Sequence, residues 1–84
     1  MKAAHKRTLT AIFSTPTPTT LAWRQVESLL IALDAQVIEG RGSRVRFELN
    51  GAVATFHRPH PRKEAKPYQI RDVRDFLTQA GIKP

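Results

Sequence analysis

The 84-residue sequence contains no cysteine, which excludes disulfide bonds, thiolate metal sites and cysteine nucleophiles. No apolar run approaches the roughly 20 residues of a membrane-spanning helix, and the N-terminus lacks the apolar segment of a secretory signal peptide. We therefore expect a cytoplasmic protein with no membrane partner. A chain this short makes one small domain, and its six aromatic residues suffice for a single two-layer core.

Acidic residues are also scarce, since seven Asp and Glu oppose fourteen Lys and Arg. The excess is concentrated in residues 41–66, which hold two acidic and seven basic residues: Arg41, Arg44, Arg46, Arg58, Arg62, Lys63 and Lys66. Arginine predominates there, and its planar guanidinium matches phosphate. A surface charged only for solubility would be more mixed in sign. The segment therefore predicts a polyanionic partner, either nucleic acid or an acidic protein.

The spacing of apolar residues predicts three helices, over residues 3–13, 21–33 and 69–80. Two prolines in residues 14–20 predict an extended connector after the first helix. We expect residues 1–20 to form an N-terminal helix and Pro/Thr linker, appended to a domain spanning residues 21–84. Trp23 is expected in the core of that domain.

Three short strands are predicted between the second and third helices, over residues 34–39, 43–49 and 52–58. Asn50-Gly51 is a strong signal for a two-residue hairpin turn, which would pair Arg44 with His57 across the last two strands. The residues that follow, 59–68, are predicted as a loop. The fold class is therefore α+β: an α-β-β-β-α unit with a three-stranded antiparallel sheet, two helices on one face, and an extra N-terminal helix.

The predicted register gathers polar side chains on the open face of the sheet: Arg44, Arg46, Glu48, Thr55 and His57. Two arginines can hold a phosphate, and a histidine can act as a base toward the 2′-hydroxyl of RNA. The face therefore has the minimal groups for RNA cleavage. The simpler interpretation, a face that only binds phosphate, remains open.

The segment His57-Arg-Pro-His60-Pro brings two histidines close together. A third ligand is missing nearby in the sequence, so we expect no metal and no other cofactor. The prolines are expected to stiffen a loop that presents Arg58, His60, Arg62 and Lys63.

Several segments in this order resemble the HicA-type toxins of bacterial toxin–antitoxin systems. They are Gly40-Arg-Gly-Ser43, the alternating hairpin, the segment with prolines and histidines, and the closing Phe76-Leu-Thr-Gln-Ala-Gly-Ile82. The resemblance spans about residues 22–83. It implies a fold similar to a double-stranded-RNA-binding domain, metal-independent cleavage of mRNA, and neutralisation by a HicB-type antitoxin.

One position departs from the family's pattern. The family's catalytic histidine follows the Gly-Ser pair on the second strand, whereas here Gly42-Ser43 is followed by Arg44. The resemblance alone therefore leaves nuclease activity undecided. If the protein is an endoribonuclease, His57 is the first candidate for the catalytic base and His60 the second. Arg41, Arg44, Arg46, Arg58, Arg62 and Lys63 are the candidate RNA-binding residues.

Three functions remain after this reasoning: an mRNA-cleaving toxin, a noncatalytic RNA-binding domain of the same fold, and a basic module that docks an acidic protein.

Overall fold

The computed structural model describes residues 1–84 and contains three helices and one sheet, in the order α1, α2, β1, β2, β3, α3. The helices are α1 (Ala3–Ile12), α2 (Trp23–Ala32) and α3 (Pro67–Gln79). The strands are β1 (Gln36–Glu39), β2 (Arg44–Leu49) and β3 (Ala52–His57). The predicted α+β class is confirmed. No helix has the length and apolar character needed to cross a membrane.

The three strands form one antiparallel sheet with β2 in the centre. The predicted two-residue turn closes the hairpin, and Asn50 and Gly51 both have positive φ, at 49° and 85°. The Asn50 side chain also donates a hydrogen bond to the carbonyl of Ala80 at 2.9 Å. The turn therefore sets the register of β2 against β3 and fastens the hairpin to the end of α3.

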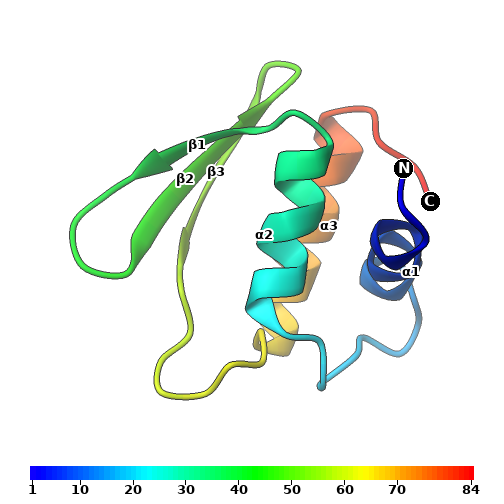
Figure 1. Ribbon diagram of the computed structural model, residues 1–84, viewed down its shortest axis with the longest axis horizontal. Helices are drawn as coiled ribbons and strands as arrows, with labels where there is room; N and C mark the ends of the chain where they lie inside the picture. Colours follow the sequence, from blue (N-terminus) through cyan, green and yellow to red (C-terminus); the bar gives the residue numbers. More distant parts are fainter.

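The sheet lies on one side of the molecule, α2 and α3 lie in the middle, and α1 contacts both of these helices on the side away from the sheet (Figure 1). Phe47 and Val45 of β2 are fully buried on the inner face of the sheet. Trp23 is 5% exposed, as expected, with its ring centroid 5.3 Å from that of Phe56. The opposite face of the sheet carries no helix and stays open to solvent.

The N-terminal helix is not an appendage, and that expectation is wrong. Leu9 and Ile12 belong to the same hydrophobic cluster as the sheet and the other helices, and Ile12 is completely buried. Arg74 of α3 donates to the carbonyls of Ile12 at 2.9 Å and Ser14 at 3.3 Å, which fixes the end of α1. The reason is that the apolar stripe of α1 packs against both α2 and α3 and so joins the common core.

Element boundaries differ from the expected ones by a few residues. Strand β1 begins at Gln36, because Asp34 has a φ of 70° and ends the preceding helical turn. Helix α3 begins at Pro67, inside the segment predicted as a loop. Proline is favourable at the first helical position, since its missing N–H has no intrahelical partner there. Gln69 completes this start by accepting the backbone N–H of Lys66 at 3.0 Å.

Candidate functional site

A hollow of about 540 Å³ lies on the open face of the sheet, at the end near the β1–β2 connection. Its lining residues are Ile38, Glu39, Gly40, Arg44, Arg46, Thr55 and His57. Arg44 pairs directly with His57, and Arg46 with Thr55, as the hairpin register predicted. The sheet thus brings two guanidinium groups, a hydroxyl and an imidazole into one small area.

The two arginines of the hollow differ in their partners. Arg44 is exposed and forms no ion pair or side-chain hydrogen bond. Arg46 lies 3.2 Å from the carboxylate of Glu48, and both side chains are well exposed. An exposed pair of this kind contributes about 1 kcal/mol or less, so an incoming anion can compete for Arg46. Arg44 is the more available cation.

Gly40 holds the start of β2 in place beside the hollow. Its N–H donates to the carbonyl of Arg44 at 2.9 Å. A Cβ atom on Gly40 would lie 3.1 Å from the Cβ of Arg44, closer than side chains normally approach. Glycine therefore allows the β1–β2 connection to pack against the stem of Arg44, which restricts where its guanidinium can go.

His57 is anchored through its backbone, while its ring stays free. The carbonyl of His57 accepts a hydrogen bond from Nε2 of Gln69 at 2.7 Å. Its exposed imidazole makes no hydrogen bond. Sequence reasoning missed Gln69 as a residue that positions the site. The available signal was glutamine at the third residue of a helix that begins with proline.

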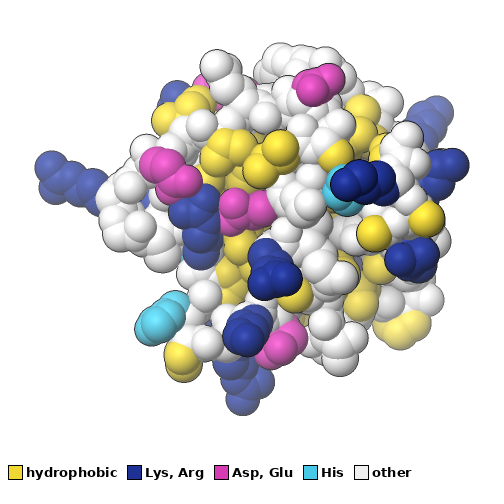
Figure 2. All heavy atoms as spheres, in the orientation of Figure 1, with side chains coloured by type: hydrophobic (Ala, Val, Ile, Leu, Met, Phe, Trp, Pro, Cys, Tyr) yellow, Lys and Arg dark blue, Asp and Glu magenta, His cyan; other side chains and the backbone are white.

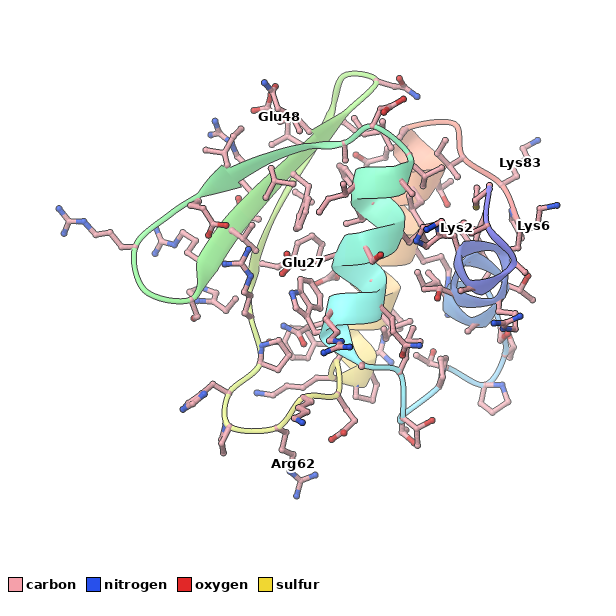
Figure 3. The ribbon with its side chains drawn as sticks, viewed as in Figure 1. Lys2, Lys6, Glu27, Glu48, Arg62 and Lys83 are labelled. Atoms are coloured by element: carbon pink, nitrogen blue, oxygen red, sulfur yellow. The ribbon has the colours of Figure 1, made fainter.

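Arg58 follows His57 in the chain, but two carboxylates occupy its guanidinium. Nε and Nη2 donate to Glu27 of α2 at 2.6 and 3.2 Å, and Nη1 and Nη2 donate to Glu39 of β1 at 2.7 and 2.9 Å. Trp23 Nε1 also donates to Glu27. Figure 3 shows Glu27 between α2 and the sheet. Arg58 therefore ties α2 to β1, and we revise the expectation that it is a free cation for RNA.

These contacts shift the ionisation of both partners. Hydrogen bonds from Arg58 lower the pKa of Glu39 below its ordinary value of 4.5. Hydrogen bonds to Glu39 and then Glu27 raise the pKa of Arg58 further above its usual range. Both shifts favour the charged forms, so the cluster stays ionised at neutral pH.

Replacing Arg58 with alanine is expected to destabilise the fold by about 1–3 kcal/mol at pH 7, because the half-buried Glu27 carboxylate loses its main partner. The difference from the parent should shrink with acid. Arg58 lowers the pKa of Glu39 in the folded state, so Glu39 contributes stability above its unfolded pKa and loses that contribution as the pH falls through the folded value. Urea unfolding of the parent and of Arg58→Ala at pH 7 and pH 3 measures the loss of stability and its decrease in acid.

The matched control is Arg62→Ala, which removes an arginine with an exposed side chain and no ion pair. It should leave stability unchanged at both pH values. Equal destabilisation by the two substitutions, or a pH-independent effect of Arg58→Ala, would contradict the role given to Arg58.

The remaining predicted site residues lie on loops outside the hollow. Arg41 is exposed in the β1–β2 connection, while His60, Arg62 and Lys63 are exposed in the segment after β3. Figure 3 shows Arg62 pointing away from this segment. His57 and His60 gain no third partner, since no group of three His, Asp or Glu side chains forms anywhere in the structure.

A larger hollow of about 740 Å³ lies at the opposite end of the sheet, near the hairpin turn. Its lining includes Asp34 and Glu48 but no basic residue. This hollow does not suit a polyanion.

Lys and Arg side chains are spread along the sheet margin, the lower loop and the α1 side (Figure 2), so charge alone would not locate a site. The hollow with Arg44 and His57 is distinguished by its combination of groups.

Comparison with known protein families gives a match over most of the chain. The sequence profile of the family described as HicA toxin of bacterial toxin–antitoxin matches residues 23–82, most of the chain. No curated protein and no solved structure matches the chain. The matched region begins at α2 and leaves α1 outside. The chain belongs to the HicA toxin family of bacterial toxin–antitoxin systems.

Proposed function

We propose that this protein is the toxin of a type II toxin–antitoxin pair and that it binds mRNA on the open face of its sheet and cleaves it without a metal ion. The observation that carries the proposal is the pairing of Arg44 with His57 in the hollow that Arg46 and Thr55 also line. Family membership supports the toxin role, and HicB-type antitoxin is the expected partner.

The proposed reaction uses the 2′-hydroxyl of the RNA itself. His57 would accept the proton of this hydroxyl while the oxygen attacks the adjacent phosphorus, and the 5′-oxygen of the next nucleotide would leave with a proton from solvent. The products are a 2′,3′-cyclic phosphate and a 5′-hydroxyl. Arg44, with Arg46 released from Glu48, would stabilise the negative charge that develops on the phosphate oxygens.

Cross-strand geometry makes this division of roles feasible. Directly paired residues on antiparallel strands have Cβ atoms about 5 Å apart, so the Arg44 and His57 side chains can reach one phosphate and its neighbouring hydroxyl. His60 is the weaker candidate for the base, because a residue on an exposed loop is aimed less well than one on a strand.

A noncatalytic RNA-binding role is the second candidate, and one observation favours it. No side chain or backbone group hydrogen-bonds to the imidazole of His57, so nothing in the free protein orients the ring. The same hollow would then hold phosphate without cutting. Binding and cleavage assays with purified protein and RNA distinguish these two functions.

RNA affinity is expected to depend strongly on salt. If about four phosphates are contacted, the slope of log K against log salt for single-stranded RNA should be roughly −3. Replacing Arg44 and Arg46 with alanine should flatten this slope by about one unit. Each arginine that neutralises a phosphate displaces counterions from the RNA, and the variant displaces fewer. Fluorescence anisotropy over a salt series gives both slopes.

The control is Lys6→Ala with Arg7→Ala, which removes the same charge from α1, on the side of the molecule away from the sheet (Figure 1). Its slope should match that of the parent. An equal change in both double variants would move the binding surface elsewhere. Absence of RNA binding at low salt would refute the proposal and favour an acidic protein as the partner.

A further inference from the structure

Tyr68 is the one aromatic side chain that the fold leaves open to solvent. Of the six aromatic residues, Trp23, Phe47, Phe56 and Phe76 are at most 5% exposed, and Phe13 packs partly buried against the core. Tyr68 is 50% exposed. Its ring therefore adds little to the core and keeps a face for a partner.

Tyr68 is linked to the end of β3 by its neighbour in the chain. It is the second residue of α3, directly before the buried Gln69. The side chain of Gln69 donates to the carbonyl of His57 at 2.7 Å and accepts the N–H of Lys66 at 3.0 Å. The start of α3 is thus fastened to the end of β3. A ring on the first turn of a helix is a more rigid platform than one on a loop.

Cations line the segment between His57 and Tyr68. Arg62, Lys63 and Lys66 are exposed there, against the single carboxylate of Glu64. The segment is fixed by backbone hydrogen bonds from Trp23 to Lys63, at 2.9 Å, and from Ala65 to Leu21, at 2.8 Å. On α3 itself, Arg71 and Asp72 follow Tyr68 at three and four residues and add no net charge there. A phosphate chain leaving the hollow over the end of β3 would pass these cations on its way to the ring.

We propose that Tyr68 is a stacking platform for an unpaired RNA base, next to the nucleotide held by Arg44 and His57. This inference rests on the proposed function and deepens it, because it adds a base-binding residue to the phosphate-binding groups of the hollow. Each of the four bases has a flat π face, so stacking on one tyrosine tolerates any sequence. A base inside a duplex is already stacked on both sides and has no free face to offer.

The test compares the parent, Tyr68→Ala and Tyr68→Phe by fluorescence anisotropy at low salt. Three probes share one 2′-O-methyl backbone, which cannot be cut through its 2′-oxygen: an unstructured single strand, the same strand carrying abasic residues, and a duplex. Tyr68→Ala should weaken binding of the unmodified single strand about 5- to 100-fold. It should leave binding of the abasic strand and the duplex unchanged, and Tyr68→Phe should retain the affinity of the parent.

Urea unfolding provides the fold control, because replacing this exposed ring should leave the stability of the parent intact. Equal effects of Tyr68→Ala on the normal and abasic strands, whether a loss or none, would overturn the stacking role while leaving RNA binding itself in place. If the parent binds none of the three probes, the proposed function fails, and this inference fails with it.

Discussion

Replacing His57 with alanine is expected to slow RNA cleavage by about 10²–10⁴-fold, the usual cost of losing a positioned general base. Binding should be almost unaffected, because Arg44 and Arg46 remain in the hollow. The side chain of His57 is exposed, so its loss should not disturb the core. Cleavage of a long unstructured RNA by purified protein, with and without EDTA, measures the rate, and we expect EDTA to leave it unchanged.

His60→Ala is the matched control, since it removes an exposed histidine three residues away from His57. This variant should cleave at the rate of the parent. Full activity in His57→Ala would remove His57 from the mechanism, and loss of activity only in His60→Ala would transfer the role. If no form cleaves but all bind RNA, the protein is a binder. Growth arrest on induced expression, compared between the parent and His57→Ala, provides the corresponding test in cells.

The hairpin that carries this chemistry was predictable because its determinants are local. A two-residue turn allows only one register, and the alternation on both strands agrees with that register. Arg44 and His57 follow from counting outward from Asn50-Gly51. Periodicity also places Phe47 inside and Arg46 outside, as observed. Short-range rules therefore predict the hairpin residues of the hollow, whereas Ile38, Glu39 and Gly40 of β1 and its connection come from the packing of β1 against β2.

The ion pairs of Arg58 with Glu27 and Glu39 could not be predicted from the sequence in this way. Its carboxylate partners lie 31 and 19 residues away in sequence, on α2 and β1. No periodicity connects these positions, and in sequence Arg58 looks like one more cation in a basic segment. Only the packing of α2 beside the sheet brings Glu27 within reach. Charge counts therefore overstate the number of cations that are free to meet a phosphate.

The contact between Gln69 and His57 also could not be predicted from the sequence, for a different reason. Its pattern indicates a helix start, which is where the structure has it. The hydrogen bond to His57 depends on the path of the intervening loop, whose course is set by its contacts with residues 21–23. Local patterns thus place each element, whereas the contacts between elements come from tertiary packing.

The second large effect is expected at α1, which lies outside the region matched by the family profile. Ile12→Ala should reduce the free energy of unfolding by about 2–5 kcal/mol, because it leaves a cavity at a completely buried position. Total stability for a domain of this size is about 5–15 kcal/mol, so the loss is a large share. Urea unfolding followed by Trp23 fluorescence measures it, since this buried indole contacts Phe56 on β3.

Ile31→Ala is the control, as it makes the same substitution in α2 at a side chain that is 55% exposed. It should change stability little, because alanine favours the helix and little buried surface is lost. Equal stability of the two variants would show that α1 is dispensable to the fold. If Ile12→Ala is destabilised as expected, its folded fraction should still bind RNA like the parent, because α1 supports α2 and α3 from the side opposite to the sheet. The helix would then contribute stability to the RNA-facing domain without taking part in its chemistry.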